Sequence, residues 1–245
     1  MKRFLFENGL TLFFLTILLL ALIGQSIAGL AEFNSHQLVS GLQTLSYGQY
    51  LVSSDFSVDV AENWQSEFLQ FSLYLLVTVW LVQRGSSESK ELDKVGPESD
   101  EEQKVGEHAQ PDSPVWAGVG GLRQAVYSRS LGITMGTIFV LSWLAQSIAG
   151  RAAFNGQQLS QRQDPVSWFG YISSADFWGR TLQNWQSEFL AVAAMAIFAV
   201  YLRQRGSPES KPVGASHDTT GKRAERLTCK LRSSTRRLRG SRFRR

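Results

Sequence analysis

The sequence contains one cysteine, Cys229, and three widely separated histidines, His36, His108 and His217. A single cysteine cannot form a disulfide within the chain, and no histidine has a second His or Cys at the spacing of a zinc site. The chain also lacks a Ser-His-Asp or Cys-His arrangement, a glycine-rich phosphate loop and paired carboxylates at catalytic spacing. We therefore expect no enzymatic activity, no metal and no cofactor.

Lysine and arginine are absent from residues 29–62, and residues 150–183 contain only three arginines, although the whole chain has a net charge of +4. The basic residues gather near the N-terminus, between the two segments and in the tail that begins at Arg203. By the positive-inside rule, both termini and the central linker are predicted to be cytoplasmic. The two basic-poor segments are then predicted to face outward.

Apolar residues are concentrated in four runs, at 10–28, 64–82, 131–149 and 185–202. The first run has Gln25 as its only strongly polar residue, and a helix of that length measures about 28 Å, close to the hydrocarbon thickness of a bilayer. The fold class predicted is an all-α membrane protein with four transmembrane helices. They would form two tandem helical hairpins of the same orientation.

A cleaved signal peptide is the alternative interpretation of residues 10–28. Two N-terminal basic residues, the apolar run and Ser26-Ile27-Ala28 have the order of charged, hydrophobic and small residues that signal peptides show. The same triplet recurs as Ser147-Ile148-Ala149, where no signal peptide can lie. The recurrence favours a membrane span at both places.

A seven-residue stretch, Asn63-Trp64-Gln65-Ser66-Glu67-Phe68-Leu69, recurs unchanged at residues 184–190. When residues 10–90 are aligned without gaps to residues 131–211, an offset of 121, 35 of the 81 pairs are identical. Random pairing gives roughly one identity in twenty. We interpret the chain as a tandem duplication.

The duplication predicts four parts. Repeat 1 occupies residues 1–92 with an outer loop at 29–63, and repeat 2 occupies residues 127–213 with an outer loop at 150–184. Residues 93–126 between the repeats form an acidic linker, and residues 214–245 form a basic tail. Neither composition can build a hydrophobic core, so both are predicted to be disordered.

The basic tail suggests which partners the chain has besides the lipid bilayer. Residues 222–245 contain eleven Lys or Arg and one acid, Glu225. Near a membrane such a cluster is attracted to anionic lipid head groups, by about 1 kcal/mol per charge. Nucleic acid is not expected, because the aromatic residues needed for base stacking are limited to Phe243.

Four polar residues fall inside the predicted spans, and they are candidate functional residues. Gln25 and Glu67 are expected at similar depth and could form a hydrogen bond, as could Gln146 and Glu188 in the second repeat. Carboxylates inside a membrane suggest proton or cation coupling. These two acids, however, lie near the outer boundary, where water reaches them, so a structural role is favoured.

Helix boundaries and interfacial anchors follow from the same pattern. Asp55 and Asp176, flanked by serines, are predicted N-caps of the second and fourth helices, and Gly85 and Gly206 are predicted C-caps. The predicted interfacial anchors are aromatic or basic residues near the ends of the spans: Trp64, Trp185, Arg84 and Arg205.

The run from Phe33-Asn34 through Glu62–Gln70 to Gln83–Lys90 resembles a family of small bacterial integral membrane proteins known only as a domain of unknown function. The resemblance covers both repeats, about two thirds of the chain. The second repeat departs from it at Gln183, where the first has Glu62. The resemblance implies a membrane location in bacteria and no known activity.

We therefore expect a multi-pass protein of the inner (cytoplasmic) membrane with both termini in the cytoplasm. Its predicted function is that of a non-enzymatic structural or interaction protein of the bacterial envelope, whose partner is another membrane protein or a second copy of the chain. The alternative is a small proton- or cation-coupled transporter or channel that uses Glu67 and Glu188.

Overall fold

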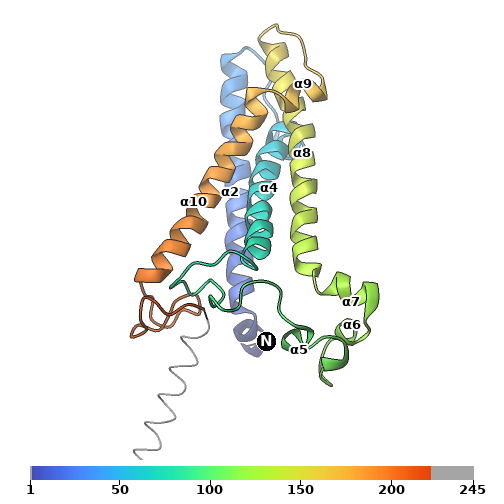
Figure 1. The fold of residues 1–245 in the computed structure, drawn as a ribbon. Coiled ribbons are helices and arrows are strands. Elements are labelled where there is room, and N and C mark those ends of the chain that lie inside the picture. The colour runs from blue at the N-terminus through green and yellow to red at the C-terminus, as the bar shows by residue number, and fades with distance from the viewer. Residues whose placement is uncertain (1, 222–245) are drawn as a thin grey trace, which may run out of the picture. The chain divides into compact units, whose positions relative to one another are not determined.

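The computed structural model describes residues 2–221, which form helices and turns and contain no β-strand (Figure 1). The predicted all-α fold is thus confirmed for the described part of the chain. Cys229 and the basic cluster at 222–245 lie outside it. The chain divides into two compact units, which we call unit 1 (Met1–Gln65 with Leu141–Leu182) and unit 2 (Ser66–Val140 with Gln183–Arg245).

Two helices, α2 (Gly9–Val39) and α8 (Ser130–Ser160), are long and apolar enough to cross a membrane. Each contains a predicted span, 10–28 or 131–149, and then continues for eleven residues beyond it. At 1.5 Å per residue, a helix of 31 residues measures about 46 Å, which exceeds the hydrocarbon thickness. The C-terminal part of each helix therefore has room to extend beyond the bilayer.

The other two long helices, α4 (Ser54–Val77) and α10 (Ala175–Tyr201), are less apolar, and only α2 and α8 qualify as spans among the described helices. Acidic residues in the first turns lower the hydropathy of both. Helix α4 also ends five residues before the predicted limit at residue 82, since the chain leaves helical geometry after Val77. The prediction of four transmembrane helices is thus supported directly for two of them.

The helix caps differ from those predicted. The Ser53 hydroxyl accepts a hydrogen bond from the Phe56 amide, and the Ser174 hydroxyl accepts one from the Phe177 amide, both at 3.2 Å. The capping residues are therefore these serines and not Asp55 and Asp176. The two aspartates lie in the first helical turns, where a carboxylate still interacts favourably with the helix dipole.

The predicted C-cap glycines do not end the helices. The helices end at Val77 and Tyr201, whereas Gly85 and Gly206 lie in the segments that follow. Both glycines have positive φ, +85° and +87°, in turns that residues with a side chain rarely adopt.

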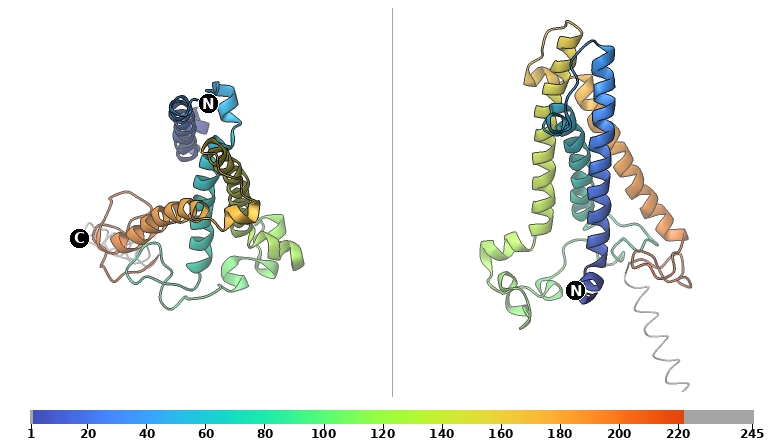
Figure 2. Two further views of the ribbon diagram at one scale, coloured as in Figure 1. Left: turned by 90° about the horizontal axis from the view of Figure 1, so that it is seen from above. Right: turned by 180° about the vertical axis from the view of Figure 1, so that it is seen from behind.

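The segments predicted as outer loops are largely helical. After α2 the chain forms a short loop and the helix α3 (Tyr47–Leu51) before α4 begins. After α8 it forms a loop and the helix α9 (Trp168–Ile172) before α10 begins. Figure 2 shows α3 packed beside α2, and the contacts of Tyr47 with Ser26 and of Tyr50 with Gly29 place it along that helix, before its C-terminal end. A long helix, a loop and a short helix thus precede both α4 and α10.

The linker contains local structure where disorder is predicted. The described elements are α5 (Asp100–Gln103), the 3₁₀ turn η1 (Gly106–His108), α6 (Val115–Gly118) and α7 (Gly121–Tyr127), while α1 (Lys2–Glu7) precedes α2. Ser99 and Glu102 form a capping box at the start of α5. This pair spans only three residues, so the element depends on local contacts.

In unit 2, residues 211–221 bind to the segment that follows α4. Gly85 N–H donates to the Thr220 hydroxyl at 2.9 Å, and Gly221 N–H donates to the Ser86 carbonyl at 3.0 Å. The buried Lys211 ammonium donates to the carbonyls of Gly85 and Thr219. This part of the chain is ordered by hydrogen bonds, although residues 214–221 were predicted to belong to a disordered tail.

Candidate functional site

Each loop in unit 1 is fixed to the helix before it by an asparagine side chain. Asn34 donates to the Leu45 carbonyl at 2.9 Å and accepts from the Leu45 amide at 2.7 Å. Asn155, 121 residues later, makes the same two bonds to Val166, at 3.1 and 2.8 Å. Each asparagine amide thus bonds both the backbone N–H and the backbone C=O of one loop residue, and these two hydrogen bonds hold the loop against the helix.

A tyrosine from each short helix packs against a glycine of the preceding long helix. Tyr50 lies against Gly29, and Tyr171, which is fully buried, lies against Gly150. A Cβ atom on Gly150 would be 2.9 Å from Cζ of Tyr171, well inside van der Waals contact. The glycines of the repeated Gln-Ser-Ile-Ala-Gly sequence are therefore needed for this close approach.

Each of these tyrosines is also packed between two phenylalanines. Ring centroids of Phe154 and Tyr171 are 5.6 Å apart, as are those of Tyr171 and Phe177. Tyr50 has the corresponding neighbours, at 5.8 and 5.6 Å. Burial, followed by the Asp176 carboxylate that accepts its hydrogen bond at 3.2 Å, raises the pKa of Tyr171. Both tyrosines thus act as neutral packing groups.

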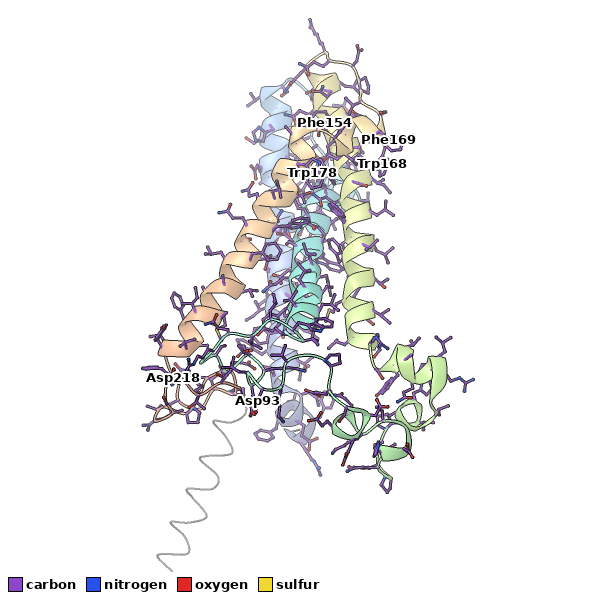
Figure 3. All side chains as sticks on the ribbon, in the orientation of Figure 1. Asp93, Phe154, Trp168, Phe169, Trp178 and Asp218 are labelled. Atoms are coloured by element: carbon purple, nitrogen blue, oxygen red, sulfur yellow. The ribbon has the colours of Figure 1, made fainter. Side chains whose placement is uncertain are left out.

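Serines of α2 and α8 bind the first residue of the following short helix. The Ser26 and Tyr47 hydroxyls are 2.8 Å apart, and the Trp168 indole donates to the Ser147 hydroxyl at 3.1 Å. Figure 3 shows Trp168, Phe169, Phe154 and Trp178 gathered where α8, α9 and α10 meet in unit 1. The serine of each Ser-Ile-Ala sequence thus makes a contact within the fold.

Arg180 on α10 forms a charge network with two helices. Its guanidinium is 3.1 Å from the Glu62 carboxylate and 3.5 Å from the Asp59 carboxylate of α4, and 3.7 Å from Asp176 on its own helix. Burial by itself would lower the pKa of Arg180, but Glu62, Asp176 and Asp59 raise it above its ordinary value. The network joins α4 to α10 through one cation and three anions.

The carboxylates of this network are partly desolvated. Burial raises the pKa of Glu62 and of Asp59, and this effect outweighs the opposing attraction of Arg180. The sequence did not predict this network: Glu62 stands out only as a difference between the repeats, and Arg180 only as one of three arginines in a segment poor in basic residues. One feature of the sequence points to the network: Arg180 lies 121 residues after Asp59, so a basic residue in the second repeat stands at the position that an acidic residue occupies in the first.

A chamber of about 690 Å³ opens within unit 1, between α2, α4, α8 and the start of α10. Its wall carries four carboxylates, those of Glu32, Asp55, Asp59 and Asp176, together with Arg180. The rest of the lining comprises aromatic, aliphatic, hydroxyl, amide and small side chains with His36, and includes both glycines that support the tyrosines. Among the described residues, no three His, Cys, Asp or Glu side chains are grouped as they would be around a metal ion.

The predicted intramembrane residues are only partly brought together. Gln146 is fully buried in unit 1 and donates through Nε2 to the Thr181 hydroxyl at 3.3 Å, so its bond is to Thr181 and not to Glu188 as predicted. The Gln146 carbonyl oxygen has no hydrogen-bond partner among the described residues. Gln25, at the equivalent position of α2, is half-buried.

In unit 2, the two predicted carboxylates influence each other. Glu188 on α10 interacts electrostatically with Glu67 on α4 and accepts a hydrogen bond from the Ser66 hydroxyl. Glu67 is exposed and Glu188 half-exposed in the isolated chain, whereas Ser66 is buried. This interaction differs from the predicted pairs, in which each glutamate contacts a glutamine.

The predicted interfacial anchors are on the surface of the chain. Trp64 is 44% exposed and Trp185 is half-exposed. Arg84 lies 3.6 Å from Asp218, and Arg205 is exposed. Asp218 and Asp93, both labelled in Figure 3, line a second hollow of about 530 Å³ in unit 2. This hollow is shallow and is formed by turns, so unit 1 provides the better defined site.

The comparisons with known proteins identify one family. The sequence profile of a domain of unknown function, DUF6766, matches residues 1–222, which is most of the chain. No curated protein and no solved structure matches the chain.

Proposed function

The chain belongs to the DUF6766 family of domains of unknown function, and from that premise we propose that it is a non-enzymatic, multi-pass protein of the cytoplasmic membrane that interacts with another protein through unit 1. The observation that carries the membrane location is the exposure of large apolar side chains along α2. Leu10 is 75% exposed and Leu20 is 63% exposed, and many neighbours on the helix are similarly uncovered. An exposed apolar helix surface of this kind supports a location in lipid.

The proposed topology has four spans, with α4 and α10 completing two hairpins begun by α2 and α8. Both termini and the linker are then cytoplasmic, and α3, α9 and the chamber face outward. The equivalent hydrogen bonds of Asn34 and Asn155, 121 residues apart, support a duplicated hairpin.

Site-directed labelling tests this topology. Cys229 is first replaced by serine, and single cysteines are introduced at Gln43 or Gln163 in the loops and at Gln103 in the linker. A membrane-impermeant maleimide should label the two loop positions in intact cells and the linker position only after permeabilisation. Labelling of the linker cysteine from outside would contradict four spans, because with α2 and α8 as the sole spans the linker lies outside.

The interaction role is supported by apolar side chains on the short helices of unit 1. Phe169 on α9 is 74% exposed, and Val52, directly after α3, is 83% exposed. Both lie on segments fixed to a long helix, so a partner would meet a preorganised surface. The partner is another membrane protein or a second copy of the chain.

A photo-crosslinking amino acid at Phe169 tests this role in cells. The expected result is a discrete adduct, either with another membrane protein or at the mass of two chains, that is absent when the amino acid is placed at the control position Gln161. Equal crosslinking at both positions would contradict a defined surface at α9.

A second candidate function is a small proton- or cation-coupled transporter or channel. The electrostatic interaction between Glu67 and Glu188 favours it, because two neighbouring carboxylates can share a proton or a cation. The test is proton or cation flux into liposomes that contain the purified protein. Flux that is lost in the folded Glu67→Gln, Glu188→Gln double variant supports transport, and an absence of flux in both proteins refutes it.

A further inference from the structure

The chamber of unit 1 carries an excess of negative charge. Glu32, Asp55, Asp59 and Asp176 contribute four carboxylates to its wall, and Arg180, which contacts Asp59 and Asp176, contributes one guanidinium, so the formal charge of these groups is three negative. A concave wall of one charge sign concentrates counter-ions, because field lines converge in the hollow. The chamber is therefore suited to cations.

These carboxylates are spread over the wall. Asp55 and Asp59 are one helical turn apart on α4, a rise of about 6 Å, while Glu32 belongs to α2 and Asp176 to α10. In the described part of the chain, no three potential ligands form a group that could surround a metal ion. A ligand whose positive charges are separated along a chain matches this arrangement better than a point charge does.

Apolar surface lies between the charges. Phe33, Tyr50 and Phe154 are in the lining, and Gly156 leaves the wall free of a side chain at its position on α8. Aromatic faces attract ammonium groups, and methylene groups gain from contact with such a wall. The volume of about 690 Å³ also falls within the range of small-molecule sites.

The fold itself places a cation in this chamber. The Arg180 guanidinium lies on a flexible aliphatic stem and is held by Asp59 and Asp176, so the wall already binds a positive group of this type. One helical turn from the wall residue Gly150, the fully buried Gln146 has a carbonyl oxygen without a partner among the described residues.

We propose that the chamber is a binding site for a short aliphatic oligoamine, whose ammonium groups pair with Glu32, Asp55 and Asp59 and whose methylene groups lie on Phe33 and Phe154. The site goes beyond the interaction role of unit 1, and it does not depend on whether anything crosses the membrane. The ligand has separated ammonium groups on an apolar skeleton, which distinguishes it from inorganic cations.

Isothermal titration calorimetry with spermidine tests the proposal on the full chain in lipid nanodiscs of zwitterionic lipid. Saturable binding of one spermidine per chain is expected at physiological salt. The Glu32→Gln, Asp55→Asn double variant should weaken the affinity tenfold or more, and the matched variant Glu91→Gln in unit 2 should leave it unchanged. Neither substituted wall residue takes part in the Arg180 network, so the fold should tolerate the change.

Two further measurements separate this site from general attraction of cations. Mg²⁺ at equal charge concentration should displace much less than half of the bound spermidine. The Arg180→Gln variant, which removes the internal competitor, should bind spermidine more tightly. Absence of saturable binding, unchanged affinity in the wall double variant, or displacement by Mg²⁺ as effective as by spermidine itself would each overturn the proposal, and none of these results would bear on the topology that the labelling experiment tests.

Discussion

Replacement of Gly150 by alanine tests the close packing of α8 against α9. The new Cβ would lie 2.9 Å from Cζ and 3.0 Å from Cε1 of Tyr171, and closer still to the hydroxyl oxygen. Carbon atoms pack best at about 3.5–4.0 Å, so either the ring or the helix must move. The ring is fully buried between Phe154 and Phe177 and cannot rotate out of the way.

The expected cost follows from a matched control on the same helix. A Cβ on Gly156 would meet no atom within 4 Å. Both substitutions gain the same helix propensity, up to about 1 kcal/mol, so this gain cancels when the two variants are compared. The overpacking cost of about 1–3 kcal/mol then remains as the difference in unfolding free energy between Gly150→Ala and Gly156→Ala.

Thermal unfolding in nanodiscs, followed by circular dichroism at one scan rate, measures this difference. For a chain of this size about 1 kcal/mol corresponds to 2–4 °C, so Gly150→Ala should melt about 2–12 °C below Gly156→Ala. Gly29→Ala, against Tyr50, should show the same direction relative to Gly24→Ala, whose Cβ has no neighbour within 4 Å.

A double-mutant cycle shows whether the tyrosine is the cause. If the ring is responsible, the cost of Gly150→Ala should shrink in a Tyr171→Leu background, where the ring atoms nearest to the new Cβ are gone. An equal cost in both backgrounds, or equal melting temperatures of Gly150→Ala and Gly156→Ala, would refute the packing argument.

Three further predictions concern unit 1. Arg180→Asp should lower the melting temperature, because it adds a fourth carboxylate to the three that surround Arg180. Adding Asp59→Arg should recover most of this loss, and failure of the double variant to recover would refute the network. Burial raises the pKa of Glu62, so the folded state binds the Glu62 proton more tightly than the unfolded state does. The stability that this proton contributes is complete below the ordinary pKa of 4.5 and is lost as pH rises through the raised pKa of the folded state. The melting temperature should therefore rise on acidification from pH 7 towards 5, and it should rise less in Glu62→Gln. Asn155→Ala should cost about 1–3 kcal/mol and increase amide exchange at Val166, because two hydrogen bonds to that residue are lost; unchanged exchange would contradict a structural role for the amide.

The long apolar helices could be predicted from the sequence because their signal is local. Nineteen consecutive residues with Gln25 as the only strongly polar member predict a helix long and apolar enough to cross a bilayer, whatever surrounds them. The helical continuation to Val39 could not be predicted in this way. It depends on the Asn34 side chain and on Tyr50, which hold the following segment against the helix.

The caps show how a correct interpretation can select the wrong residue. Ser53 and Asp55 both favour a helix start, and only the backbone geometry decides which side chain reaches the free amide. For Gly85, the composition predicted a helix end, but the helix had already ended at Val77. Boundaries depend on a few degrees of backbone rotation, whereas the existence of a helix depends on many residues.

The candidate site was largely beyond sequence reasoning because its members are distant in the chain. Glu32, Asp59 and Asp176 belong to three helices, and no spacing rule connects them. The sequence pointed instead to Glu67 and Glu188, whose identical surroundings made them conspicuous. The chamber combines positions that the two repeats share, such as Asp55 and Asp176, with positions at which they differ, such as Glu32 and Asp59, so a search for identities finds only part of it.

The contact between Asp59 and Arg180 has a consequence for the pairing of the two halves of the chain. The two residues are separated by 121 positions and so occupy equivalent places in the two halves. Two copies of the first half, brought together in this way, would oppose aspartate to aspartate, and two copies of the second would oppose arginine to arginine. This contact therefore favours the pairing of the two different halves over the pairing of either half with a copy of itself, and it makes the chain asymmetric at this point.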